Sequence, residues 1–405
     1  MKNKKVLYGI LIALLAVGMF FAGWYLKDAQ NEKEIPVSAP TEAMVEATEE
    51  TIPETEPVEK PDAITMAVYP YVSNMELFQK VLTEMWTEME PDVELQYIDW
   101  NCYSDPYPNN IDVITYDALF LEHLALSGYI QPLEVDSVSN TAGIIPFAME
   151  GARYQGDLYG LPFLVCSSFL MYDKEDTAMD KVENFPDLIK EMAKRKKKDP
   201  NDGLHAGYAD EVPFFYLDAY IDYMGAYTTY EHGPMMTPPD ETIVKRLLEM
   251  KANLAPVPEG HGYQSAFSHG YGSACYAYSE SLYFMGDIVN DLTIRPISFF
   301  EGENIQMFYA DIASLCSQVT DPVKKEYCMK LINLIASVEF QTQLVYGTGD
   351  VQYMLPAREQ VYLSAKEQYP VYEVLHNLAT DENNRVFRFG IEIYDYKNLA
   401  SVAFR

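Results

Sequence analysis

Residues Val6–Leu26 contain no charged side chain, and they are numerous enough to cross a bilayer core of about 30 Å. Three lysines lie within the first five residues, whereas few positive charges follow the segment directly. This asymmetry predicts that the N-terminus lies in the cytoplasm and that all later residues lie outside the membrane. Bulky residues flank the small residues that a cleavage site would need, so residues 1–30 are predicted to be an uncleaved anchor, with a cleaved secretory signal as the alternative.

Residues 31–62 are rich in Glu, Pro and Thr and contain almost no large apolar side chain. Such a composition cannot bury enough surface to offset the loss of chain entropy on folding. We therefore expect a disordered, self-repelling linker. The folded part is then 63–405, which is long enough for two lobes that each bury a substantial interior.

The chain carries a formal net charge of -32. A field of this sign repels nucleic acid and attracts cations, so nucleic acid is excluded as a partner and a cationic ligand is favoured. The alternative is that the acidic residues serve only solubility.

Apolar periodicity predicts strands that alternate with helices at the start of the folded part. The expected strands are Ile64–Val68, Val93–Ile98 and Val113–Tyr116, and the expected helices are Met75–Glu88 and Leu119–Leu126. This order is typical of a parallel α/β sheet, whose ligands bind beyond the carboxyl ends of the strands. Four side chains follow these strands and are candidates for such a site: Tyr69, Tyr71, Tyr103 and Asp117.

Further helices are predicted up to Lys198 and over Leu217–Met224 and Thr242–Leu254. The basic run 194–198 is interpreted as a solvated helix C-terminus, where positive charge is favourable. No internal repeat is present.

Five cysteines are present, and an odd number outside the membrane leaves at least one unpaired. No close pair of cysteines has the spacing of a zinc site, and the histidines are scattered. His261 and His269 could touch a ligand, but they are more typical of loop residues. We expect neither a metal nor a cofactor, and whether any other cysteines form a disulfide stays open.

An ordered series of motifs runs through the folded part. It comprises Tyr69-Pro70-Tyr71, Trp100–Tyr103, Tyr116-Asp117-Ala118, Pro146–Gly151, the segment Tyr159–Leu170 around Cys166, Tyr276–Glu280, Tyr309-Ala310-Asp311 and Gly349–Tyr353. This series, from Ile64 to about Tyr362, resembles thiaminase I, thiamine pyridinylase.

The resemblance implies a two-lobed α/β fold of the periplasmic-binding-protein type (type II) with an interlobe cleft. Lobe one would comprise about 63–163 and 305–355, and lobe two about 168–300 and the C-terminal helices. The chain would cross between the lobes near Pro162–Leu170 and return near Met307–Asp311. A monomer is expected.

The resemblance also implies residue roles. Cys166 would attack the pyrimidine of thiamine, and Glu280 would take its proton. The thiazole would leave, and a small nucleophile (an amine, a pyridine or a thiol) would take its place. The residues around the substrate would be Tyr69, Tyr71, Tyr103, Asp117, Tyr278, Tyr309 and Asp311.

The residue chemistry agrees with these roles, because a thiol needs a nearby base to attack and a thiazolium ring prefers an acidic, aromatic pocket. Taken alone, Cys166 in its apolar run would be read as a small core residue. Asp117 alone would be read as a helix N-cap.

The chain departs from the family pattern in its predicted tether and in the segment between Cys166 and Glu280, which includes 226–232. The alternative function is a non-catalytic, membrane-tethered solute-binding protein for thiamine or a related cation. Such a protein would need neither the thiol nor its base. A structural adhesion protein is a third and weaker alternative.

Overall fold

The computed structural model describes residues 59–69, 72–139, 141–225, 239–302, 305–388 and 390. The predicted anchor, residues 31–58 of the predicted linker, Tyr71 and the segment 226–232 lie outside these residues. Among the helices that are described, none is both long and apolar enough to cross a membrane.

One mixed sheet forms the centre of what we call the first lobe, with the strand order β12-β6-β11-β3-β1-β2 and β13 paired to β11. β1 is parallel to β2 and β3, as predicted, whereas β11 is antiparallel to β3 and β6. Nearly every side chain of β3, β6 and β11 is buried, as expected for strands covered on both faces. The strands are β1 (Ala63–Val68), β2 (Glu94–Asp99), β3 (Val113–Asp117), β6 (Gly160–Cys166), β11 (Met307–Leu315), β12 (Leu355–Pro356) and β13 (Arg385–Val386).

Amphipathic helices and a short hairpin pack on this sheet. In α2 the Asn74 side chain caps the N-terminus by accepting a hydrogen bond from the Leu77 N–H, and Phe78, Leu82 and Trp86 face the core. The first-lobe elements are α2 (Met75–Met89), η1 (Ala118–Phe120), α3 (Leu121–Leu126), η2 (Val135–Ser137), α4 (Pro146–Gly151), the hairpin β4 (Arg153–Tyr154) and β5 (Asp157–Leu158), α10 (Pro322–Ile335), α11 (Val338–Thr342), η6 (Gln343–Gly347), α12 (Glu359–Ala365) and α13 (Val371–Ala379).

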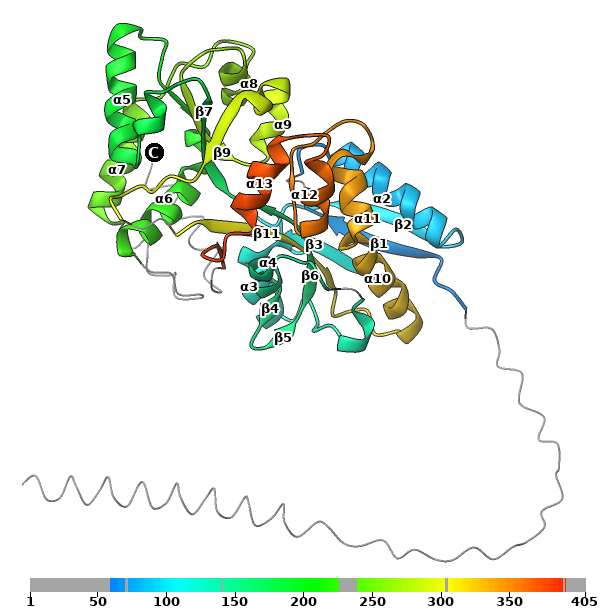
Figure 1. Cartoon of the computed structure of the whole chain (residues 1–405). Coiled ribbons are helices and arrows are strands. Elements are labelled where there is room, and N and C mark those ends of the chain that lie inside the picture. The colour runs from blue at the N-terminus through cyan, green and yellow to red at the C-terminus, as the bar shows by residue number, and fades with distance from the viewer. Residues whose placement is uncertain are drawn as a thin grey trace, which may run out of the picture. The chain divides into compact units, whose positions relative to one another are not determined.

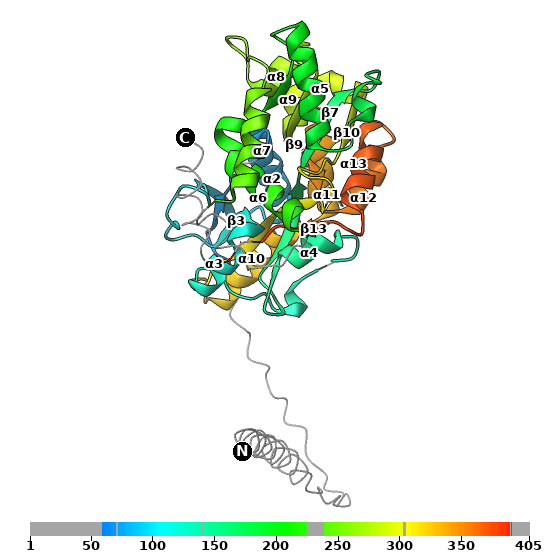
Figure 2. The same cartoon turned by 90° about the vertical axis from the view of Figure 1, so that its left-hand side faces the viewer.

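A second sheet with the order β10-β7-β9-β8 forms the centre of the second lobe. Figure 1 and Figure 2 both show α5 to α9 gathered around this sheet. Its elements are β7 (Ser168–Asp173), η3 (Met179–Lys181), α5 (Phe185–Lys198), β8 (Leu204–Ala206), α6 (Tyr208–Met224), α7 (Glu241–Ala252), α8 (Tyr263–Ser268), β9 (Ala274–Tyr278), α9 (Ser281–Met285), η5 (Gly286–Asp291) and β10 (Leu292–Arg295).

The first crossing between the sheets lies within Pro162–Leu170, as the resemblance implies, whereas Met307–Asp311 is already part of β11, so the return lies just before it. β6 ends at Cys166 in the first sheet and β7 begins at Ser168 in the second, so Ser167 is the crossing residue. The return runs from β10 to β11. The two crossings are joined because the Ser167 hydroxyl donates to the Met307 carbonyl and the Gln306 side chain donates to the Ser168 carbonyl at 3.1 Å.

Two expectations need correction. The C-terminal helices were assigned to lobe two, but β12 pairs with β6 and α12 packs against α11 and β12, so they continue the first lobe. The helix predicted from Leu217 begins earlier, at Tyr208, and Pro213 lies inside it without ending it.

The basic end of α5 is partly solvated as predicted, although Arg195 forms a bidentate ion pair with Asp176 at 2.6 and 2.9 Å.

Candidate active site

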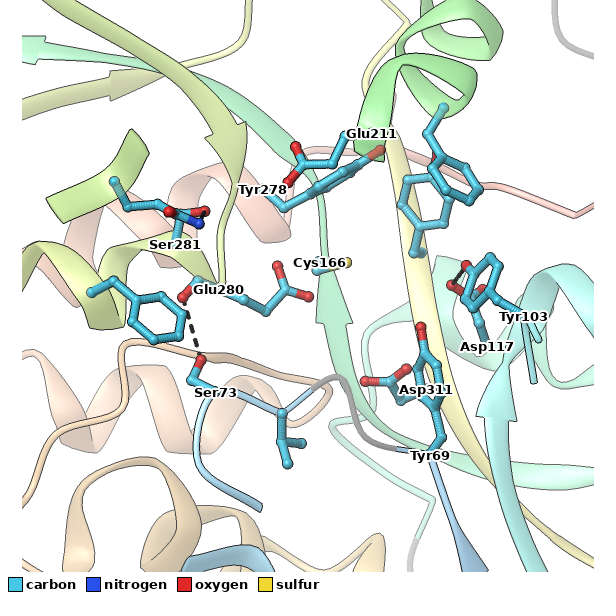
Figure 3. A pocket seen from close by; sticks show the side chains of 15 residues that line it. Tyr69, Ser73, Tyr103, Asp117, Cys166, Glu211, Tyr278, Glu280, Ser281 and Asp311 are labelled. Carbon is cyan, nitrogen blue, oxygen red and sulfur yellow. Dashed lines mark hydrogen bonds between the residues drawn. The ribbon is translucent and has the colours of Figure 1, made fainter. Parts of the chain in front are cut away.

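A cavity of about 480 Å³ receives side chains from both sheets and from the loops that follow their strands. Eight of the nine predicted site residues line it, and Tyr71 lies outside the described residues. Figure 3 shows these side chains pointing into one space. The lining residues are Tyr69, Val72, Ser73, Tyr103, Asp117, Cys166, Glu211, Phe214, Gln264, Tyr278, Glu280, Ser281, Phe284, Tyr309 and Asp311.

Strand register brings four of these side chains to one face of the first sheet. Cys166 on β6 lies opposite Tyr309 on β11, and Asp311 lies opposite Asp117 on β3. Tyr309 and Asp311 are two residues apart on one strand, so their side chains point to the same face. A register shift follows Asp311 in the pairing with β6. Antiparallel pairing therefore collects a thiol, a phenol and two carboxyls from three distant segments.

Glu280 reaches the thiol from the second lobe, directly after β9 (Figure 3). The Ser279 N–H donates to the Ser167 carbonyl at 2.9 Å, and this bond fixes the start of the loop beside the crossing residue. The Ser279 hydroxyl donates to Glu280 Oε2 at 3.2 Å. From the first lobe, the Ser73 hydroxyl donates to the Glu280 carbonyl at 3.3 Å, so both lobes hold this residue.

The thiol and the Glu280 carboxyl are an electrostatic pair. Burial raises the pKa of Cys166 well above its usual range, and the carboxylates of Glu280 and Asp311 raise it further. Burial also raises the pKa of Glu280, while its hydrogen bond with Cys166 opposes that rise. The thiol therefore keeps its proton at rest, so any attack by it would need a nearby base, and the Glu280 carboxyl is in a position to act as one.

The two aspartates opposite each other are held in a proton-retaining environment. Burial raises the pKa of Asp117 to about 7, although hydrogen bonds from the Leu119 N–H at 3.0 Å and the Tyr103 hydroxyl at 2.8 Å lower it. Burial and the charges of Asp117 and Glu280 raise the pKa of Asp311 well above its usual range. Asp117 thus fits both sequence interpretations, since it caps η1 and also lines the cavity.

Aromatic rings form the walls. The Tyr69 and Tyr103 rings lie 5.9 Å apart between centroids at a tilt of 34°. The Tyr278 and Tyr309 rings meet edge to face at 5.6 Å. Phe214, which the sequence analysis did not identify, packs edge to face on Tyr103 at 5.4 Å. Such rings offer flat apolar faces to an aromatic or cationic ligand.

Seven further lining residues, from the β1–α2 loop and from helices of the second lobe, were not predicted from the sequence. These are Val72, Ser73, Glu211, Phe214, Gln264, Ser281 and Phe284. Glu211 and Phe214 lie in the first half of α6, which was predicted to be outside the helix. Gly207 could have indicated the true start of the helix, because it is the N-cap residue of α6 and glycine is favoured at that position.

The other candidate groups lie elsewhere. His261 and His269 pack together with ring centroids 4.8 Å apart and do not line the cavity. None of the five cysteines forms a disulfide, and all except Cys166 are buried.

A second, much smaller cavity of about 10 Å³ lies beside the crossing segments and has room for about one water molecule. Asp218 and Asp222, one turn apart on α6, line it together with Gln306 and Met307. Burial raises the pKa of Asp218 well above its usual range and that of Asp222 to about 7.

Comparison with known proteins gives one consistent assignment. A family model for bacterial extracellular solute-binding proteins matches residues 104–371, which indicates an extracytoplasmic protein. The curated Thiaminase-1 of Paenibacillus thiaminolyticus is 35% identical over 347 residues, which are 82% of this chain and 84% of that protein.

Two solved structures agree. Thiaminase I from Bacillus thiaminolyticus has a TM-score of 0.76 and 33% identity, and the match covers 85% of this chain and all of that one. Clostridium botulinum thiaminase I in complex with thiamin has a TM-score of 0.78 and 29% identity over 84% of this chain and 98% of that one. The chain therefore belongs to the thiaminase I family, is a transferase of the thiamine pyridinylase type, and has the α/β fold of bacterial solute-binding proteins.

Proposed function

We propose that this protein cleaves thiamine by base exchange, transferring the pyrimidine-methyl group from the thiazole to an amine, pyridine or thiol. The observation that carries the proposal is the meeting of Cys166 and Glu280, from different lobes, in one cavity opposite two buried aspartates. A relative of this chain has been solved with thiamin bound, which supports the choice of substrate.

In the first half-reaction the Cys166 sulfur adds to the electron-poor pyrimidine ring while Glu280 removes the thiol proton. Asp117 and Asp311, with their raised pKa values, can donate hydrogen bonds or a proton to the ring as negative charge develops on it. The bond from the methylene carbon to the thiazolium nitrogen then breaks. Its electron pair stays on nitrogen, so the thiazole leaves as a neutral molecule.

In the second half-reaction the acceptor attacks the methylene carbon, and the bond between sulfur and the ring breaks. Glu280 then returns its proton to the departing thiolate. Tyr69, Tyr103, Tyr278 and Tyr309 would hold the rings by stacking or by hydrogen bonds, and Tyr71 is proposed to join them on the resemblance alone. No cofactor is needed to balance these steps.

We also propose that residues 1–30 anchor the protein in the membrane, that residues 31–62 form a disordered spacer, and that the protein is a cell-surface monomer. The apolar run Val6–Leu26 and the acidic composition of the linker support this arrangement. Two lobes within 63–405, with the boundaries corrected as above, complete the proposed organisation.

The experiment that tests the function incubates the purified full-length protein with thiamine and aniline, and follows thiazole release and pyrimidine-adduct formation by mass spectrometry. We expect both products in equal amounts. Tight binding of thiamine without release would support the alternative of a tethered binding protein. If the protein neither binds thiamine nor releases thiazole, the cavity serves another ligand.

A further inference from the structure

Glu211 is a carboxylate of the cavity to which the proposed chemistry gives no role. It lies in the first turns of α6 and lines the cavity from the second lobe, whereas Asp117 and Asp311 line it from the first sheet. In Figure 3, Glu211 and Tyr278 lie on one side of Cys166, and Asp311 and Tyr69 lie on the other. The cavity therefore has acidic groups at two separate places.

The Glu211 side chain is held in place. The Tyr263 hydroxyl donates to Glu211 Oε1 at 2.9 Å and lies 3.2 Å from the Ser281 hydroxyl, to which Gln264 Nε2 also donates at 3.4 Å. The carboxyl rests against the Cα of Gly207, where an added Cβ would overlap it. The N-terminal turn of a long helix is a favourable place for negative charge.

The two acidic places suit different parts of the substrate. The pyrimidine must lie against Cys166 and within reach of Asp117 and Asp311, since those groups act on it. The group on the other side of the methylene bridge must then extend into the remaining part of the cavity. A carboxylate with neighbouring aromatic rings such as Phe214 and Tyr278 suits a cationic heterocycle.

We propose that Glu211 is the specificity-determining residue of an exchange-group subsite, where it binds the cationic ring of thiamine before cleavage and an amine acceptor after it. The inference rests on the proposed base-exchange function. As an amine or pyridine forms its bond to the methylene carbon, its nitrogen gains positive charge, which Glu211 stabilises. A thiol acceptor gains no such charge, and its thiolate is repelled by the carboxylate. Glu211 therefore favours amine over thiol acceptors.

The test compares full-length wild type with Glu211→Gln at saturating thiamine, measuring kcat/KM for aniline and for 2-mercaptoethanol. We expect the aniline-to-thiol ratio of kcat/KM to fall about tenfold, the size expected for loss of one charge-assisted contact. In a second series, in which the thiamine concentration is varied, KM for thiamine should rise. Glu259→Gln is the matched control, because it removes the same charge from an exposed second-lobe position outside the cavity. It should leave the ratio unchanged.

Two further variants keep the test decisive if Glu211→Gln does not fold. Tyr263→Phe removes the hydrogen bond to Glu211, and Gly207→Ala displaces its carboxyl; each should lower the same ratio by a smaller factor. If the wild type is active and the aniline-to-thiol ratio of Glu211→Gln stays within twofold of it, this inference is overturned and the proposed function is not. If Glu211→Gln is unfolded, the same conclusion follows when the ratios of both Tyr263→Phe and Gly207→Ala stay within twofold. A wild type that releases no thiazole with either acceptor overturns the proposed function and, with it, the subsite.

Discussion

Two pairs of aspartates, Asp117 with Asp311 and Asp218 with Asp222, have raised pKa values in common but differ in their surroundings. In both pairs burial is the largest cause of a raised pKa. In each pair the charge of one member also raises the pKa of the other, since Asp117 acts on Asp311 and Asp222 acts on Asp218. The first pair lies on facing strands of the first sheet. The second pair lies one turn apart on α6 in the second lobe.

The difference is the space that each pair borders. Asp117 and Asp311 border a cavity of about 480 Å³ that also contains Cys166, whereas Asp218 and Asp222 border one of about 10 Å³. A small organic ligand fits only the first. A pKa raised by burial therefore does not by itself mark a catalytic group, and ligand-sized space beside a nucleophile must accompany it.

The contacts of the second pair indicate a structural task. Asp218 accepts a hydrogen bond from the Ser168 hydroxyl at 3.4 Å, and Asp222 accepts one from the Phe299 N–H at 2.7 Å. Ser168 starts the second-lobe strand after one crossing, and Phe299 lies in the return segment between β10 and β11. The pair thus holds the crossing segments against α6.

The largest effect should come from Glu280, the carboxyl proposed to receive the thiol proton. Glu280→Gln keeps the size of the side chain and one acceptor oxygen but removes its basicity. We expect kcat for thiazole release to fall by ~10²–10⁴. The rate at which a thiamine-like electrophile alkylates Cys166 should fall as well. An unchanged alkylation rate would show that another group activates the thiol, and the cleft carboxyls would then need new roles.

The direct contrast between the pairs is Asp311→Asn against Asp218→Asn, the same chemical change at two buried sites. Loss of a proton donor to the developing ring charge should lower kcat/KM by ~10²-fold in Asp311→Asn. Asp218→Asn should stay within about fivefold of wild type, since its side chain touches no part of the cavity that holds Cys166. Steady-state thiazole release measures both. Equal losses would erase the distinction between the pairs.

The two pairs should differ in their effect on activity but have similar effects on the free energy of unfolding. Because the pKa of Asp117 and of Asp218 is raised in the folded protein, each stays protonated in the folded state at pH values where the unfolded chain has ionised. The folded state then binds more protons, so stability is highest below the unfolded pKa and falls as the pH rises toward the folded value, about 7 for Asp117.

We therefore expect Asp117→Asn and Asp218→Asn to raise the free energy of unfolding at pH 7 by about 1–2 kcal/mol, and to leave it nearly unchanged near pH 3. Urea unfolding at the two pH values checks this. A loss of stability at pH 7 in either variant would mean that its ionised carboxylate is well solvated or paired in the folded protein.

The smallest effect should come from the hydrogen bond that joins the lobes at the catalytic loop. Ser73→Ala removes the donor to the Glu280 carbonyl and leaves the Glu280 carboxyl in place. A neutral hydrogen bond contributes about 1 kcal/mol, so we expect kcat/KM to fall about three- to tenfold with little change in thermal stability. Ser104→Ala, which alters an exposed hydroxyl bonded only locally to Asp105, is the control. Full activity in Ser73→Ala would show that this bond does not help place Glu280.

Local sequence patterns predicted the elements of the first lobe well as far as α3. The apolar spacing in Met75–Met89 and the alternating strands up to Asp117 depend on neighbouring residues, so they are visible before folding. The two crossings and the chemistry of Cys166 came from the resemblance to a family.

What local patterns could not supply was register and second-lobe geometry. That Asp311 faces Asp117 depends on pairing between strands almost 200 residues apart, which no local periodicity encodes. Glu211 was missed because the helix was predicted only from Leu217, whereas α6 begins at Tyr208 and continues through Pro213. The assignment of the C-terminal helices to lobe two came with the resemblance, and it was wrong because β12 pairs with β6 of the first sheet.

The most direct test of the account is to identify the residue that becomes covalently attached to the pyrimidine. The full-length protein would be mixed with thiamine without an added acceptor, quenched in acid, digested and analysed by peptide mass spectrometry beside Cys166→Ser. We predict a pyrimidine-methyl adduct on the peptide that contains Cys166, released when aniline is added before the quench. Thiazole release that persists in Cys166→Ser, or an adduct on another residue, would contradict the assignment of this cavity as the site of nucleophilic attack.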